Sequence, residues 1–153
     1  MAALDLKIPP PVVGLAVAGL VYGIARLVPE AGFDHPLRPW VALVIAVTGL
    51  AIDLSALRAF FRHRTTANPL SPQRSSSVVT SGIYRFSRNP MYLGMLLLLT
   101  AWAVWQGNGA AFLALPLFVL YITVFQIKPE EQILRAKFGA PYDAYLRRVR
   151  RWI

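Results

Sequence analysis

The sequence has no cysteine, only two histidines and few charged residues. The lack of cysteine excludes a disulfide framework and a thiolate nucleophile. The two histidines, His35 and His63, are far apart in the sequence and lack the short spacing of a metal-ligand pair, so we expect no metal site. Charged residues make up 15% of the chain, whereas soluble domains contain about 25%. This deficit argues against a soluble globular protein.

Apolar residues dominate what is present: they are 56% of the 153 residues, and the mean hydropathy is +0.50. A helix needs roughly 20 apolar residues to cross the hydrocarbon core of a bilayer. Four apolar runs approach this length, and Asn108-Gly109 supplies a tight turn between the last two. We therefore predict an all-α, polytopic membrane protein of one domain with about four transmembrane helices. The predicted spans are residues 11–28, 39–61, 90–106 and 110–127.

Basic residues give the chain a net charge of +9. Such a charge can indicate nucleic-acid binding, but here the lysines and arginines lie beside the apolar runs and form no soluble basic face. Loops rich in Lys and Arg stay in the cytoplasm. We therefore expect the loop 62–89 and the tail 128–153 to be cytoplasmic, with both termini on the cytoplasmic side of the cell inner membrane. The expected partner is membrane lipid, not nucleic acid.

A first cluster of polar residues stands at the start of the third predicted span, in Arg88-Asn89-Pro90-Met91-Tyr92-Leu93-Gly94. Asn89 suits a helix N-cap and Pro90 the first helical position, which explains much of the pattern. A helix N-terminus with free N–H groups beside Arg88 also suits a carboxylate or a phosphate. Both interpretations remain open at this point.

A second cluster, Glu130-Glu131, follows the fourth predicted span. Two acidic residues after Pro129 favour the start of a helix, but two carboxylates just below the membrane face also suit a cationic ligand or ribose hydroxyls. A third candidate is Asp53, which lies inside the second span, where an ionisable residue indicates a functional site by default. Pairing with an arginine, or contact with interfacial water, would also explain it.

The end of the tail alternates apolar and basic residues at helical spacing. This pattern predicts a cytoplasmic amphipathic helix that lies at the membrane interface. Its apolar face comprises Tyr142, Tyr145, Leu146, Val149 and Trp152 or Ile153. Its basic face comprises Arg147, Arg148, Arg150 and Arg151, of which we expect Arg147, Arg150 and Arg151 to face lipid headgroups.

Together these segments resemble the superfamily of isoprenylcysteine carboxyl methyltransferases and phospholipid methyltransferases. The resemblance covers residues 65–153 and rests on the order and spacing of the helix entrance at 88–94, Glu130-Glu131, Phe138-Gly139-Ala140-Pro141-Tyr142-Asp143-Ala144-Tyr145 and Arg148-Val149. It implies a membrane enzyme that transfers a methyl group from S-adenosylmethionine to a hydrophobic or lipid-linked acceptor. The residues that it implies for cofactor binding are Arg88, Asn89, Tyr92, Gly94, Glu130, Glu131, Tyr142, Tyr145 and Arg148.

One residue departs from the pattern of the superfamily, because Asn89 stands where the superfamily has histidine. Asparagine cannot titrate near neutral pH. The resemblance therefore implies a binding or capping role for Asn89 and argues against proton transfer by this residue. The sequence assigns no catalytic residue, and the best candidates are Arg88 and Asn89.

Other functions remain open. A non-catalytic membrane scaffold or a lipid-binding protein would keep the same fold without turnover, and it would tolerate Glu131→Gln and Tyr145→Phe. A transporter is a weaker alternative, because four short spans and one intramembrane charge give little indication of a substrate path. The sequence also leaves the methyl acceptor open: isoprenylcysteine, phospholipid amines, thiols and small hydrophobic acids all fit.

Overall fold

The regular elements are all helices in the part of the chain that the structure, a computed structural model, describes: residues 5–62, 72 and 77–153. The longer helices are α1 (Pro10–Leu27), α2 (Arg38–Arg62), α3 (Pro90–Gln106), α4 (Leu115–Ile122), α5 (Lys128–Phe138) and α6 (Ala140–Arg148). Three helical stretches are long and apolar enough to cross a membrane, namely Pro10–Leu27, Arg38–Arg62 and Ala110–Phe138, and α3 is a shorter apolar helix of 17 residues. The predicted all-α membrane fold is therefore confirmed.

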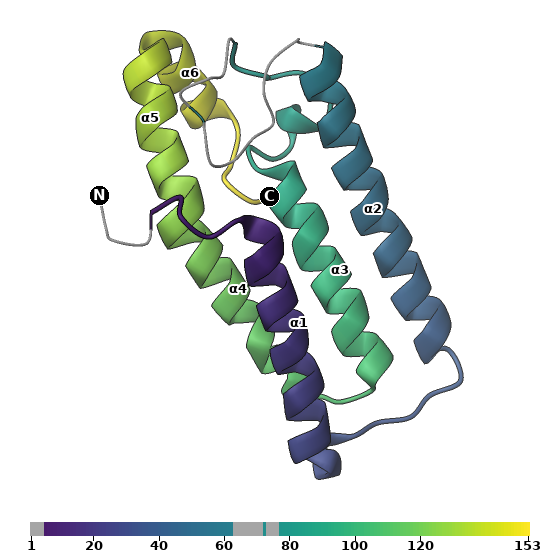
Figure 1. Cartoon of the computed structure of the whole chain (residues 1–153). Helices are drawn as coiled ribbons and strands as arrows, with labels where there is room; N and C mark the ends of the chain where they lie inside the picture. Colours follow the sequence, from purple (N-terminus) through teal and green to yellow (C-terminus); the bar gives the residue numbers. More distant parts are fainter. Residues whose placement is uncertain (1–4, 63–71, 73–76) are drawn as a thin grey trace.

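Figure 1 shows α1, α2, α3 and α4 running side by side, with α3 between α1 and α2. The connection between α1 and α2 and the turn between α3 and α4 lie at one end. Helices α5 and α6 and the C-terminal segment lie at the other end, where α2 finishes and α3 begins. Part of the predicted loop 62–89, including His63, falls within 63–71 and 73–76, which lie outside the described residues.

The turn between α3 and α4 is held by backbone and amide hydrogen bonds. Gly107 ends α3 with a φ of +62°, where a side chain would collide with the Phe33 carbonyl oxygen, so glycine suits the position. Asn108 is buried, and its Nδ2 donates to the Val28 carbonyl oxygen at 2.7 Å. Its Oδ1 accepts the Ala111 N–H at 3.2 Å. The turn therefore joins two antiparallel helices, as the Asn-Gly pair indicates.

Helices α2 and α3 cross closely because glycines face each other at the crossing. A Cβ on Gly49 would lie 2.8 Å from the Gly94 carbonyl oxygen, and a Cβ on Gly94 would lie 2.8 Å from the Gly49 carbonyl oxygen. A Cβ on Gly94 would also collide with the carboxylate of Asp53. Gly94 therefore keeps α3 against α2 and leaves space for an acidic side chain of α2.

The last apolar stretch runs as one helix from Ala110 to Phe138, but its geometry changes along the way. A 3-10 turn (Ala110–Ala114) precedes α4, and a π-helical turn (Thr123–Ile127) joins α4 to α5. Pro129 explains the π turn, because proline lacks the N–H that would bond to the Phe125 carbonyl oxygen four residues earlier. The Leu6 N–H donates to that oxygen at 3.0 Å instead, so the N-terminal segment packs onto the π turn.

The predicted amphipathic helix of the tail is wrong beyond Arg148. Helix α6 ends there, and Val149 is extended, with a φ of −119° and a ψ of 134°. The buried side chains of α6 and the residue after it, Tyr142, Tyr145 and Val149, pack against α5 and Val78. The predicted apolar face therefore contacts protein and not lipid. After Val149 the chain turns back, and residues 150–153 run to the start of α3 (Figure 1).

Candidate active site

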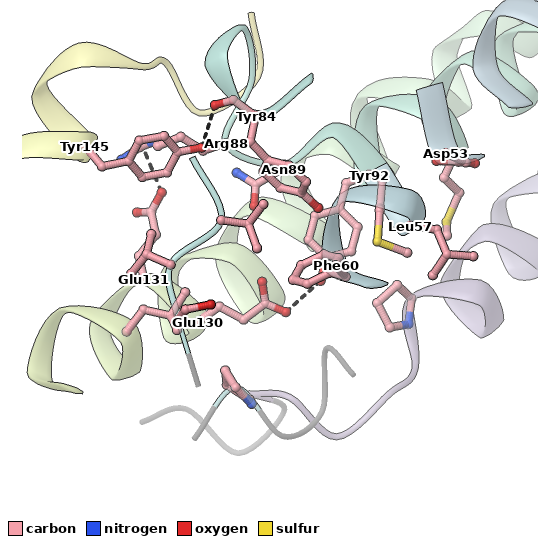
Figure 2. A pocket seen from close by; sticks show the side chains of 18 of the residues that line it. Asp53, Leu57, Phe60, Tyr84, Arg88, Asn89, Tyr92, Glu130, Glu131 and Tyr145 are labelled. Carbon is pink, nitrogen blue, oxygen red and sulfur yellow. Dashed lines mark hydrogen bonds and ion pairs between the residues drawn. The ribbon is translucent and has the colours of Figure 1, made fainter. Parts of the chain in front are cut away.

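A cavity of about 380 Å³ lies where the start of α3 meets α5 and α6. This volume falls within the roughly 300–1,000 Å³ of small-molecule sites. Of the nine residues that the resemblance implies for cofactor binding, seven line the cavity. These are Arg88, Asn89, Tyr92, Glu130, Glu131, Tyr142 and Tyr145. Residues from distant parts of the sequence are thus brought to one site (Figure 2).

The entrance of α3 is held by the C-terminal segment. The Arg88 N–H donates to the Arg150 carbonyl oxygen at 3.0 Å, and Asn89 Nδ2 donates to the Arg151 carbonyl oxygen at 2.9 Å. The Asn89 side chain therefore does not cap α3, contrary to the N-cap interpretation. The Ser87 hydroxyl, which is buried, accepts the Asn89 N–H at 3.1 Å. Pro90 is the first residue of the helix, as expected.

Two arginines share the carboxylate of Glu131. Arg88 Nη2 lies 3.1 Å from Oε1, while Arg151 donates from Nε to Oε1 at 3.1 Å and from Nη2 to Oε2 at 2.7 Å. The forked Arg151 contact is the strong, charge-assisted kind. We predicted from the sequence that Arg151 would face lipid headgroups, and this is wrong, because the chain reversal after Val149 turns its side chain inward.

The group of two arginines and one glutamate carries a net positive charge. The side chain of Arg88 is 11% exposed, and its Nε is buried without a hydrogen-bond partner among the residues that the structure describes. Buried donors are normally satisfied by protein, water or ligand. This corner of the cavity therefore suits an anionic group such as a carboxylate.

Glu130 lies beside Glu131 but has different partners. The Tyr92 hydroxyl donates to Glu130 Oε1 at 2.6 Å, and Gln126 Nε2 donates to the same oxygen at 3.0 Å. Gln126 is buried in the π turn, so this irregular turn delivers a donor to the site. The second carboxylate oxygen of Glu130 has no hydrogen bond among those between described residues. It is available to a hydroxyl or an ammonium group.

Three tyrosines from outside the apolar helices form an aromatic wall. The Tyr145 hydroxyl donates to the Tyr84 carbonyl oxygen at 2.8 Å, and the Tyr142 and Tyr145 rings have centroids 6.2 Å apart. Burial raises the pKa of Tyr84, Tyr142 and Tyr145 well above the ordinary value. The three phenols therefore stay neutral, and their rings can face a cation.

The remaining wall of the cavity is apolar and extends along α1, α2 and α3. It comprises Pro10, Pro11, Leu54, Leu57, Met91 and Met95. Leu54 is 57% exposed on the outer surface of the helices. Asp53 interrupts this apolar wall. One end of the cavity is thus polar and charged, whereas the other reaches the surface that lipid would cover.

Two predicted residues are not part of the cavity lining. Gly94 packs against α2 at the helix crossing, and Arg148 is exposed on α6. Sequence reasoning missed Gln126 and Tyr84 and misplaced Arg151. Gln126 lies four residues before Glu130, and side chains at this spacing are neighbours on a helix. Helical spacing alone therefore indicates this pair. No comparable signal exists for Arg151, because its position depends on a chain reversal.

Comparison with known proteins identifies the family. The family model described as phospholipid methyltransferase matches residues 37–141, which is more than half of the chain. A protein of Haemophilus influenzae, described as uncharacterized, is 49% identical over 63 residues, which are 41% of this chain and the whole of that protein. No solved structure matches.

Two rice proteins are more distant relatives. Those of Oryza sativa subsp. indica and subsp. japonica are each described as a probable protein-S-isoprenylcysteine O-methyltransferase, and each is 28% identical over 125 residues, or 82% of this chain. This chain spans 65% of the length of each rice protein. The predicted superfamily is confirmed, and the chain belongs to the phospholipid methyltransferase family.

Proposed function

We propose that this member of the phospholipid methyltransferase family transfers a methyl group from S-adenosylmethionine to a hydrophobic or lipid-linked acceptor at the cytoplasmic membrane face. The observation that carries the proposal is a single cavity with a charged, aromatic end and an apolar arm. The first suits a polar cofactor and the second an acceptor that reaches the site from lipid.

The residues at the charged end fit the chemistry of S-adenosylmethionine. Arg88, with its unpartnered Nε, would hold the carboxylate of the cofactor. The free oxygen of Glu130 would accept from its amino group or ribose hydroxyls, and the rings of Tyr142 and Tyr145 would face its positive charge. The cofactor supplies an electrophilic methyl group when it is bound.

The protein contributes orientation and the exclusion of water. Glu131 and Arg151 fix the position of Arg88 through the shared ion pair, and Gln126 and Tyr92 fix Glu130. Groups held in this way lose little further freedom when the substrates bind, and positioning supplies much of the rate of a bimolecular transfer. The apolar wall keeps water from the reacting atoms.

Calorimetric titration of the purified protein in lipid nanodiscs with S-adenosylmethionine tests the proposal. We expect saturable binding that Glu131→Gln and Tyr145→Phe weaken, because each removes a contact that shapes the site. Tyr22→Phe is the matched control, since Tyr22 is 47% exposed and far along α1 from the cavity. Absence of saturable binding, or equal binding by all four proteins, would favour the non-catalytic scaffold instead.

A second assay identifies turnover. Membrane extract is incubated with the protein and S-adenosylmethionine that carries a labelled methyl group, and the labelled product is identified by mass spectrometry. We expect the label in a component that partitions with lipid. Label in water-soluble components alone would contradict an acceptor that enters from the membrane.

A further inference from the structure

The π turn at Thr123–Ile127 sets the direction in which the acidic residues of α5 point. At 3.6 residues per turn, side chains four residues apart drift by about 40° around an α-helix, so a regular helix would turn Glu130 about 120° away from Phe118. A π turn winds more slowly, because its hydrogen bonds span five residues, and it takes up part of this drift. Phe118, Ile122 and Gln126 are all buried. The turn thus aligns the buried side of α4 with the side of α5 on which Glu130 lines the cavity.

Gln126 is the residue through which the π turn reaches the cofactor site. Its Nε2 donates to Glu130 Oε1 at 3.0 Å, and the same oxygen accepts from the Tyr92 hydroxyl at 2.6 Å. With Oε1 held by two donors, the other carboxylate oxygen is left for a ligand. A change in the winding of the turn would move Gln126 around the helix and away from Oε1. The orientation of Glu130 therefore depends on the winding of the turn.

The N-terminal segment, residues 5–9, is fastened to this turn. Pro129 has no N–H to donate to the Phe125 carbonyl oxygen, and an acceptor without a donor is costly in apolar surroundings. The Leu6 N–H donates to this oxygen at 3.0 Å. Figure 1 shows the segment crossing the last long helix where α4 passes into α5. The carbonyl group that proline leaves free is thus the point at which the N-terminal segment is attached.

The backbone of Leu6 is bent to make this contact. Among the residues that the structure describes, Leu6 is the one non-glycine residue with a positive φ, at 55°. Such a conformation is uncommon for a bulky residue, and it persists where the surrounding structure imposes it. Ile8 packs against the apolar core of α1, α3 and α4, and Pro10 and Pro11 line the cavity. The chain is therefore fixed on the α1 side of Leu6, and the strained residue directs its N–H to the π turn.

From this arrangement we propose that the N-terminal segment is a positioning element of the cofactor site. The Leu6 N–H holds the π turn in the winding that aims Gln126 at Glu130. Leu6 is not among the residues that line the cavity, so it acts through the turn and not by contact with a ligand. The inference rests on the proposed function, in which Glu130 binds S-adenosylmethionine, and it adds a role for a segment that the site itself does not contain.

The first test uses two variants of Leu6 and no cofactor. Leu6→Pro removes the N–H and fixes φ at about −65°, whereas Leu6→Asn keeps the N–H and tolerates a positive φ. Both remove the leucine side chain, so their comparison isolates the backbone contact. NMR of the protein in nanodiscs, with ¹⁵N in the glutamine side chains, reports on Gln126, whose signal is assigned by its absence in Gln126→Met. We expect the signal to move in Leu6→Pro and to keep its position in Leu6→Asn. An unmoved signal in Leu6→Pro would overturn the proposal.

The second test needs no variant, so it stands even if Leu6→Pro folds poorly. Coupling between two sites is reciprocal, so S-adenosylmethionine, by fixing Glu130, should also stabilise the Leu6 contact. We expect the Leu6 amide to exchange slowly without cofactor, and a further severalfold more slowly at saturating cofactor. Exchange as fast as that of an unprotected amide, or exchange that saturating cofactor leaves unchanged, would overturn the proposal.

The third test measures the affinity for S-adenosylmethionine by calorimetry. We expect Leu6→Pro to raise the Kd about tenfold, equivalent to about 1.4 kcal/mol, and Gln126→Met to raise it similarly. The double variant should bind about as weakly as the weaker single variant, because both changes interrupt one path. Effects that multiply to about a hundredfold would overturn the proposal, since Leu6 would then act independently of Gln126.

The outcomes separate this inference from the proposed function. Movement of the Gln126 signal in Leu6→Pro, without saturable binding of S-adenosylmethionine by the unmodified protein, would refute the proposed function and support the control of Gln126 by Leu6. Saturable binding that Leu6→Pro leaves unchanged would refute the present inference alone.

Discussion

Arg151→Ala should loosen the segment that holds the entrance of α3. The substitution removes both hydrogen bonds to Glu131, at 3.1 Å and 2.7 Å, and leaves Arg88 as the one cation on that carboxylate among the described residues. Hydrogen bonds to charged groups contribute about 1.5–3 kcal/mol. The Arg151 side chain is 33% exposed, so solvent screening places the loss for the whole contact at about 2 kcal/mol.

Two measurements follow this loss. If residues 150–153 must be in place for cofactor binding, a loss of about 2 kcal/mol raises the Kd for S-adenosylmethionine by roughly thirtyfold. Hydrogen exchange of the Arg88 amide, which donates to the Arg150 carbonyl oxygen, should also become faster. The exchange measurement requires no ligand, so it tests the structural part of the argument separately.

Arg150→Ala is the matched control, because Arg150 is the neighbouring residue and its side chain is exposed. It carries the same charge change without the contact to Glu131. We expect its Kd and its amide exchange to stay within about twofold of the unmodified protein, the size of a surface substitution. Indistinguishable behaviour of the two variants would refute the reasoning, since the effect would then follow net charge alone.

Two further predictions concern stability. Gly94→Ala should lower the free energy of unfolding by about 1–3 kcal/mol, and with it the thermal midpoint, because the added Cβ would lie 2.8 Å from the Gly49 carbonyl oxygen. Gly23→Ala is the control, because nothing lies within 4 Å of the added Cβ, and it should leave the thermal midpoint unchanged. Burial, the largest cause, raises the pKa of Tyr142 and Tyr145 above the unfolded value. Their contribution to stability is therefore present below about pH 10 and is lost as the pH rises above it. A thermal midpoint that stays constant from neutral to strongly alkaline pH would contradict this.

The helices were predictable because their signals are local. Apolar runs long enough for a bilayer, prolines at the first turn and the Asn108-Gly109 turn fixed the helices to within about a turn, and α3 coincides with the predicted run 90–106. The π turn at Thr123–Ile127 was not predicted. Pro129 leaves the Phe125 carbonyl oxygen without its usual helical donor, and the N-terminal segment supplies an N–H to that oxygen. Because this contact joins residues that are distant in the sequence, no local pattern indicates it.

The candidate site was predictable only in part, for a similar reason. Seven of the nine residues taken from sequence motifs line one cavity, but their partners depend on tertiary contacts. Arg151 fits the basic face of a continuous helix, so periodicity assigned it to lipid. The helix ends at Arg148 instead, and the extended Val149 reverses the chain. One non-helical residue thus changes the environment of the side chains that follow it. A periodic pattern of apolar and basic residues does not predict such a change.

The return of residues 150–153 to the start of α3 has a consequence for the order of assembly. These residues follow all of the apolar helices in the chain, and proteins are synthesised from the N-terminus. The apolar helices can therefore enter the membrane and pack before Glu131 acquires its second arginine or Asn89 its carbonyl partner. Insertion into the membrane and completion of the site become separate events, and a nascent chain that is already in the bilayer still lacks the contacts that hold the cavity in shape.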